Sequence, residues 1–169
     1  MIRRPQLPSI AANPTLSRRH VFRLGAAAAA ATVGGGMVSD DAEAAARGAR
    51  IARAALKRRG KGYSYLGTGP QKYGCSGLVY VSVLEGAGRD LSVDLLRQYH
   101  SSRPVGRKKV RKGDLVFFKG TQGKMKGPTH VGIAISRTKM VHAANRKSGV
   151  TVDSISTYRK YFLGVRRVP

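Results

Sequence analysis

The amino-acid sequence predicts an α+β domain in which helices come first and a mostly antiparallel β-sheet follows. Three observations support this fold class. Residues 49–100 contain stretches with the apolar spacing of helices, residues 113–168 contain short runs rich in β-branched and aromatic residues, and glycine-containing or polar turns separate these runs. Helices followed by a series of strands are typical of an α+β arrangement.

Length and composition limit the classes of protein to consider. The chain has 169 residues, of which 41% are hydrophobic, enough for one ordinary domain with a core and short extensions. Its single cysteine excludes an internal disulfide framework and a cysteine-based zinc cluster. A formal net charge of +24 indicates an anionic partner, which could be nucleic acid, a membrane surface or an acidic wall polymer.

The N-terminal residues have the layout of a twin-arginine export signal. Paired arginines, Arg18 and Arg19, precede a mild apolar run of mostly alanine and glycine at residues 24–38. This run is too short for a confident membrane span. The alternative interpretation is a basic arm followed by an alanine- and glycine-rich linker.

Small residues follow the apolar run and suit a cleavage site after Ala44 or Ala46. We therefore expect a signal peptide at residues 1–46 and one domain at residues 47–169. The remaining domain has 27 basic and five acidic residues, a net charge of +22. We expect it to work outside the cytoplasm, in the periplasm, the cell wall or the medium.

The predicted elements follow in chain order. Glycine and polar stretches bound them, and the loops at 101–112 and 121–128 are rich in lysine and arginine or in glycine and lysine. The expected elements are an amphipathic helix at 49–59, a glycine-rich loop at 63–70, a helix from Cys75 to about Gly86 or Gly88, a polar helix at 93–100, a strand at 113–118, a hairpin at 130–144, and strands at 149–152 and 162–168.

Cys75 stands at the predicted start of its helix, between Gly74 and Gly77. Backbone N–H groups in the first turn carry partial positive charge, which favours the thiolate and makes the sulfur a usable nucleophile. The alternative is a small buried hydrophobic residue, because free cysteine is often buried.

Two histidines in the predicted hairpin could act on this thiol. If the turn spans three residues centred on Arg137, His142 lies opposite Gly132 and on the same face as His130, about 7–8 Å away along the ladder. Gly132 then leaves space for the two rings. His130 would be the base that activates Cys75, and His142 would orient its ring.

Other kinds of site have less support. No third ligand stands at a suitable spacing on the hairpin, where Asp114 and Asp153 are the nearest acids, so we expect no metal. The glycine-rich loop at 63–70 lacks the Gly-Lys-Ser/Thr ending of a nucleotide loop, and we expect no cofactor. The shortage of aromatic residues argues against nucleic acid as the partner.

Six motifs in the same order resemble those of the NlpC/P60 family of cell-wall cysteine peptidases, over roughly residues 50–169. They are Tyr63-Ser64-Tyr65-Leu66-Gly67, Cys75-Ser76-Gly77-Leu78-Val79, Gly113-Asp114-Leu115-Val116-Phe117-Phe118, His130-Val131-Gly132-Ile133, Val141-His142-Ala143 and Gly164-Val165-Arg166-Arg167-Val168.

The resemblance implies a papain-like fold and hydrolysis of the peptidoglycan stem peptide between D-glutamate and the following diamino acid. Cys75 would be the nucleophile and its N–H part of the oxyanion hole, His130 the general base and later acid, and His142 the orienting residue. Tyr63, Gly74 and Ser76 would line the substrate pocket. Family members usually carry aspartate where Gly74 stands, which puts recognition of a free amino end of the peptide in question.

The basic residues form a second feature. They cluster before and after the strand at 113–118, and we expect them to hold the protein on anionic envelope polymers. A merely solvated basic face is the simpler reading. We expect a monomer that the twin-arginine machinery exports as a precursor, and the alternative function is a catalytically idle wall-binding module of the same fold.

Overall fold

The computed structural model describes residues 39–121 and 127–169 and confirms the predicted α+β class. Five helical elements and eight strands occur in the described residues, in an order that puts most helices before most strands. The helices are α1 (Asp40–Leu56), α2 (Cys75–Ala87), α3 (Leu95–His100) and the 3-10 elements η1 (Arg107–Lys109) and η2 (Ile155–Tyr161). The strands are β1 (Gly62–Tyr63), β2 (Lys72–Tyr73), β3 (Arg103–Val105), β4 (Leu115–Phe118), β5 (His130–Ala134), β6 (Lys139–Asn145), β7 (Gly149–Ser154) and β8 (Phe162–Arg167).

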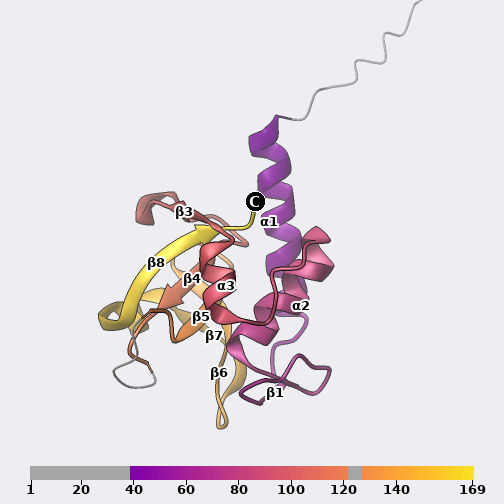
Figure 1. Ribbon diagram of the computed structural model, residues 1–169, viewed down its shortest axis with the longest axis vertical. Coiled ribbons are helices and arrows are strands. Elements are labelled where there is room, and N and C mark those ends of the chain that lie inside the picture. The colour runs from indigo at the N-terminus through magenta and orange to yellow at the C-terminus, as the bar shows by residue number, and fades with distance from the viewer. Residues whose placement is uncertain (1–38, 122–126) are drawn as a thin grey trace, which may run out of the picture. The chain divides into compact units, whose positions relative to one another are not determined.

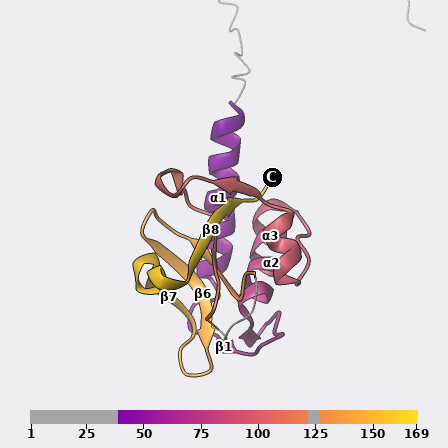
Figure 2. The same ribbon diagram turned by 60° about the vertical axis from the view of Figure 1, so that its left-hand side comes forward.

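Six strands form one antiparallel sheet in the order β3-β8-β4-β5-β6-β7, and β1 and β2 form a separate parallel pair. Helices α1 and α2 pack on each other and on β5 and β6, as Figures 1 and 2 show. Because side chains alternate across a strand, the neighbouring strands β8, β4, β5 and β6 contribute to two apolar clusters. The cluster under the helices includes Val79, Val83, Leu115, Phe117, Val131 and Ile133, and the one on the opposite face includes Val116, Phe118, Met140, Ile155 and Val165.

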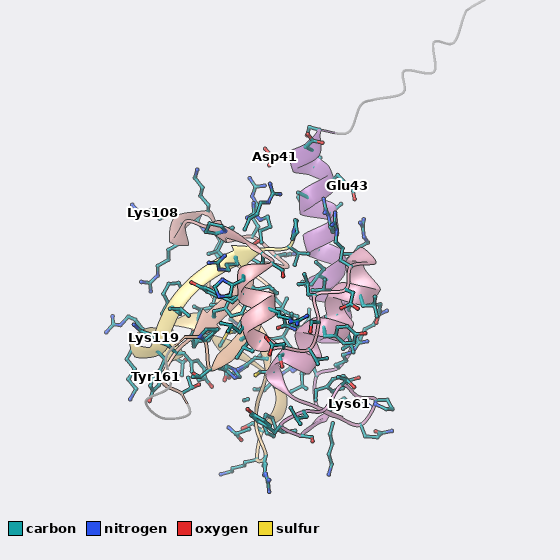
Figure 3. The ribbon with its side chains drawn as sticks, in the orientation of Figure 1. Asp41, Glu43, Lys61, Lys108, Lys119 and Tyr161 are labelled. Carbon is teal, nitrogen blue, oxygen red and sulfur yellow. The ribbon has the colours of Figure 1, made fainter. Side chains whose placement is uncertain are left out.

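Helix α1 begins earlier than the predicted residue 49. Ser39 caps it, its side chain accepting from the Ala42 N–H, and the acidic residues of its first turn suit the partial positive charge of a helix N-terminus. Asp41 and Glu43 project from this part of the helix in Figure 3. Burial in α1 begins only at Gly48, so the predicted boundary after residue 46 falls inside the helix but before its buried part.

The predicted signal motif lies outside the described residues, and the domain boundary stays a prediction. Across residues 39–121 and 127–169, no helix combines the length and the hydropathy that crossing a bilayer requires.

Helix α2 starts and stops at glycines, as the sequence predicts. It ends at Gly88, whose φ of 63° lies in the left-handed region and whose N–H donates to the Leu84 carbonyl. Gly86 allows α1 to approach closely, because a Cβ at Gly86 would lie 2.5 Å from the Ile51 nitrogen. The two helices therefore pack almost backbone to backbone at this point.

The prediction of a plain loop at residues 101–112 is wrong. Residues Arg103–Val105 form β3, which pairs with β8 at the edge of the sheet, and residues Arg107–Lys109 form η1. The proline in β3 weakened the sequence signal for a strand, but an edge strand tolerates proline because one side of it needs no ladder hydrogen bonds. The predicted strands at 113–118, 149–152 and 162–168 are present with shifted ends.

Candidate active site

Cys75 is the first residue of α2 and is 8% exposed. Gly74, at the N-cap, has no side chain to satisfy the first-turn N–H groups, so these donors remain available near the sulfur. Burial raises the pKa of the Cys75 thiol, and hydrogen bonds from the backbone of Val131, Ser76 and Cys75 itself oppose this in part. The first-turn N–H groups thus act on the thiol in the expected direction, but burial has the larger effect and the net shift of its pKa is upward.

The histidine hairpin has the predicted register. Ile133 pairs with Val141, Ala134 pairs with Met140, and the Ile135 N–H donates to the Lys139 carbonyl over 2.9 Å, so the turn is centred on residue 137. The same register puts residue 142 opposite residue 132.

Gly132 provides the expected space beside this pair. A Cβ built there would lie 2.7 Å from the Met140 sulfur and 3.2 Å from the His142 Cβ. A side chain at position 132 would thus compete with His142 for its place.

The two histidine rings are in direct contact. Nε2 of His130 lies 2.7 Å from Nδ1 of His142, and Nε2 of His142 lies 2.9 Å from Oδ2 of Asp153. The Tyr158 hydroxyl donates to the same carboxylate oxygen over 3.1 Å. Four side chains from β5, β6, β7 and η2 thus form one hydrogen-bonded chain.

This chain assigns the protons on both rings. Because the Asp153 carboxylate can only accept, His142 donates its Nε2–H to it, and Nδ1 of His142 is then the acceptor. His130 therefore donates its Nε2–H to His142, and its Nδ1 carries a free lone pair. The arrangement leaves one basic nitrogen of His130 available to take a proton.

Both rings are neutral near neutral pH. Burial lowers the pKa of His130 to about 3, with a smaller contribution from His142. Burial also lowers the pKa of His142, while the hydrogen bond and the charge of Asp153 act in the opposite direction. Burial and the charge of Asp153 raise the pKa of Tyr158 to about 12, so its hydroxyl keeps its proton.

The sulfur lies beside this histidine pair, where β5 and β6 separate. The Ala134 N–H donates to the Asp114 carbonyl in β4, so even-numbered N–H groups of β5 point to β4 and the Val131 N–H points toward β6. The β5–β6 pairing ends at Ile133, so Val131 has no ladder partner in β6 and its backbone interacts with Cys75 instead.

Cys75 thus lies against the residue next to His130. Within residues 39–121 and 127–169, no hydrogen bond joins the sulfur to either imidazole. The expected direct contact between the thiol and the two rings is therefore absent, and the sulfur lies near the backbone next to His130. Active-site hydrogen bonds are often long before substrate binds.

The three predicted pocket residues lie around the start of α2. Tyr63 packs against the apolar cluster that includes Cys75, and burial and then the charge of Cys75 raise the pKa of its hydroxyl. The Ser76 carbonyl accepts a hydrogen bond of 2.9 Å from Nε2 of the buried Gln98. Gly74 is covered by the preceding turn, because a Cβ there would lie 2.2 Å from the Tyr65 carbonyl oxygen.

Sequence reasoning missed Asp153 and Tyr158 as members of the site. Asp153 was considered only as a metal ligand. It stands opposite Met140 in β7, two residues from the partner of His142, so it shares a face with that histidine. The alternation of Thr151 and Asp153 along the strand was the available signal. Only the β6–β7 register shows that this face of β7 is the one beside His142. Among the described residues, no cluster of three or more His, Cys, Asp or Glu side chains could hold a metal.

A model of the NlpC/P60 family matches residues 60–167, so the chain belongs to this family. The probable endopeptidase p60 of Listeria monocytogenes is 36% identical over 116 residues, which cover 68% of this chain and 22% of that protein. The murein DD-endopeptidase MepH of Escherichia coli is 29% identical over 118 residues, covering 67% of this chain and 43% of MepH.

A third relative has two activities in its name. The bifunctional muramidase/DL-endopeptidase CwlT of Bacillus subtilis is 31% identical over 121 residues, covering 70% of this chain and 36% of CwlT. This chain therefore spans less than half the length of these three relatives. Their names describe endopeptidases of peptidoglycan or, for p60, a probable endopeptidase.

Solved structures agree with the fold. The NlpC/p60 domain of the peptidoglycan hydrolase SagA superposes with a TM-score of 0.62 and 27% identity, covering 70% of this chain and 97% of that domain. The peptidoglycan hydrolase RipB of Mycobacterium tuberculosis gives a TM-score of 0.61 at 22% identity, covering 75% of this chain and 66% of RipB, and supports the fold alone.

Proposed function

We propose that this chain is an exported peptidoglycan hydrolase that cleaves a stem-peptide amide bond with Cys75 as nucleophile. One observation carries the proposal: the Asp153–His142–His130 chain leaves Nδ1 of His130 as a free base, next in sequence to Val131, whose backbone acts on the Cys75 thiol. A buried base with an ordered partner and a nearby thiol is the arrangement that acyl transfer requires.

The first half of the reaction forms an acyl-enzyme. Nδ1 of His130 accepts the proton of the Cys75 thiol as the sulfur attacks the carbonyl carbon of the substrate. The negative oxygen of the tetrahedral intermediate accepts hydrogen bonds from the Cys75 N–H and its first-turn neighbours, and each such donor can contribute about 3–4 kcal/mol to the transition state. The C–N bond then breaks, and His130 returns its proton to the leaving amine.

The second half releases the acid product. A water molecule gives one proton to Nδ1 of His130 while its oxygen attacks the thioester carbon. Collapse of this intermediate breaks the C–S bond and returns the proton to the sulfur. The Asp153 carboxylate accepts the hydrogen bond from His142 and stabilises the positive charge that the histidine pair carries between these transfers.

The scissile bond is proposed from the family resemblance. The names of the relatives include both DD- and DL-endopeptidases, so different members of the family cut different bonds. We assign this chain the bond between D-glutamate and the diamino acid, with Tyr63, Gly74 and Ser76 in the pocket. The Tyr65 carbonyl occupies the place that an aspartate at position 74 would need. A side chain at position 74 would therefore require the Ser64–Gly67 turn to move.

Location and partners complete the proposal. Arg18 and Arg19 support export through the twin-arginine route, and a net charge of +22 on residues 47–169 supports retention on anionic envelope polymers outside the cytoplasm. No nucleic acid partner and no second subunit enters this proposal.

The test uses two substrates and one variant. Wild-type protein and Cys75→Ala are incubated with intact sacculi and with purified stem peptides, and mass spectrometry identifies the fragments. We expect the wild type to release a fragment that ends in D-glutamate, and Cys75→Ala to release none. Equal release by both proteins would refute the proposal that this chain is the hydrolase. A fragment cut between two D-residues would show that the scissile bond differs from the proposed one.

A second function is supported by the state of the thiol. Burial raises the pKa of the Cys75 thiol, which is nearly buried and not hydrogen-bonded to His130 within the described residues. A wall-binding module that keeps the fold but does not turn over would look similar. It would sediment with sacculi in the same assay while releasing no fragment, whereas the hydrolase does both.

A further inference from the structure

A cavity of about 260 Å³ lies on the sheet face opposite α1 and α2, apart from Cys75 and both histidines. It opens between η1, the β5–β6 turn, the end of β7 and the start of β8. Arg107 and Arg137 stand on its walls, and no acidic residue is among the described residues that line it. Lys108, which η1 also carries, projects outward from this region in Figure 3.

The two guanidinium groups line the same cavity, and each has a contact of its own. Nη2 of Arg137 donates to the Lys108 carbonyl over 3.4 Å, and the Arg107 guanidinium lies 4.7 Å from the centre of the Phe162 ring. Neither arginine forms a salt bridge among the described residues. Guanidinium N–H groups match the oxygens of phosphate well, and two of them without acidic partners favour an anion.

The floor of the cavity is apolar. Its side chains belong to the second apolar cluster, and they are mostly buried. They are Val110, Ile155, Phe162 and Val165. A bare inorganic anion would leave this surface uncovered, so the ligand should also carry carbon atoms.

The rim supplies hydroxyl groups. Ser154 and Ser156 share a hydrogen bond of 2.7 Å between their side-chain oxygens, and Thr138 lines the same edge. These groups can donate to and accept from the hydroxyls of a polyol. Residues 1–38 and 122–126 are poor occupants of an arginine-lined cavity, because their sequences contain arginine and lysine but no acid.

We propose that this cavity is a binding site for the phosphate ester of a small polyol, such as a glycerol phosphate unit of an envelope polymer. Arg107 and Arg137 bind the phosphate, the serine and threonine hydroxyls bind the polyol, and the apolar floor covers its carbons. The site is independent of the proposed hydrolysis, and its occupation does not require Cys75.

The test is an NMR titration of the full chain with glycerol 3-phosphate, with glycerol and inorganic phosphate as separate probes. We expect saturable shifts of the Thr138, Ser154 and Ser156 amides with the ester and weaker ones with either fragment. Arg107→Gln/Arg137→Gln should weaken binding of the ester by about tenfold or more. The matched control Arg59→Gln/Arg89→Gln removes the same charge from exposed positions elsewhere and should change it less than about twofold.

Several results would overturn the site. Equal weakening by the two double variants would mean diffuse attraction to a basic surface. If inorganic phosphate bound as tightly as the ester, the polyol would have no part in recognition. If phosphatidylglycerol vesicles, added as a further probe, bound and the soluble ester did not, the surface would be a membrane-binding site. Thermal unfolding of both double variants verifies that a loss of binding is not a loss of fold.

Discussion

Asp153 stands opposite Met140 in the β6–β7 ladder, yet its Oδ2 lies 2.9 Å from Nε2 of His142. Asp153 and His142 are thus diagonal neighbours on one face of the sheet, and their side chains can reach each other across that separation. This contact turns a pair of histidines into an ordered chain, because the carboxylate decides which nitrogen of His142 carries the proton. The tautomer of His130 then follows from that of His142.

Asp153→Asn should lower kcat by roughly 10- to 100-fold with little change in KM. The variant keeps the shape of the side chain but removes the charge that stabilises the histidine pair when it is protonated. The loss should be smaller than the about 10⁴-fold effect of neutralising the carboxylate that contacts the base itself in a serine triad, because His142 lies in between. Steady-state kinetics on the stem peptide measures both constants.

Two further variants separate charge from geometry in this prediction. Tyr158→Phe removes one donor to Asp153 and leaves the charge, so its effect on kcat should be smaller. Asp90→Asn removes one negative charge from an exposed position after α2 and should leave kcat unchanged. An Asp90→Asn loss as large as that of Asp153→Asn would contradict a role for the hydrogen-bonded chain.

Alkylation of Cys75 should be slow at pH 7 and should accelerate up to and beyond pH 9. Burial raises the pKa of the thiol, so the reactive thiolate is rarer than in an exposed cysteine at the same pH. Because Cys75 is the only cysteine, the rate of iodoacetamide labelling of the whole protein reports this residue alone. The unfolded protein in denaturant is the control and should react faster at pH 7. A rate that levels off below pH 7 would show a stabilised thiolate instead.

The sequence was sufficient for the parts of the site that depend on local pattern. Glycines around Cys75 predict where α2 starts, and the residue count between His130 and His142 predicts that they share a face. Both inferences use only the period of one helix or one hairpin. The histidine contact could therefore be predicted before any coordinates.

Other features depend on interactions between distant segments, and local pattern could not predict them. Asp153 joins the site only through the β6–β7 register, which has an irregularity between Ala143 and Asn145. The raised pKa of Cys75 results from burial, which local sequence does not give. Strand β3 was missed because its pairing with β8 spans about 60 residues of chain.

Gly74→Ala should destabilise the fold and disturb the Ser64–Gly67 turn. In the present backbone the added Cβ would lie 2.2 Å from the Tyr65 carbonyl oxygen, so the turn must move. Overpacking of this kind typically costs about 1–3 kcal/mol. Chemical denaturation gives the change, and Gly106→Ala is the control because nothing lies within 4 Å of a Cβ at that position. Equal stability of the two variants would mean that the turn moves without cost.

The free energy of unfolding should fall as the pH drops from about 6.5 toward 3, and His130 should account for part of this loss. The pKa of His130 is lowered to about 3 in the folded protein by burial, whereas the unfolded chain binds the proton near the ordinary value of 6.5. Above pH 6.5 His130 is unprotonated in both the folded and the unfolded state, so it does not change how the free energy of unfolding varies with pH there. Below it, the unfolded state gains a proton that the folded state does not, which costs up to about 1.4 kcal/mol per pH unit.

His130→Asn should therefore show a shallower decline of unfolding free energy between pH 6.5 and 4.5 than the wild type, whatever its stability at pH 7. Denaturation curves at a series of pH values give the slopes. The contributions of all other titrating groups cancel when the slope of the variant is compared with that of the wild type. His100→Asn replaces an exposed histidine in α3 and should leave the slope close to that of the wild type. If His130→Asn and the wild type declined in parallel, His130 would have to be protonated in the folded protein, and the tautomer that frees its Nδ1 would be lost over that pH range.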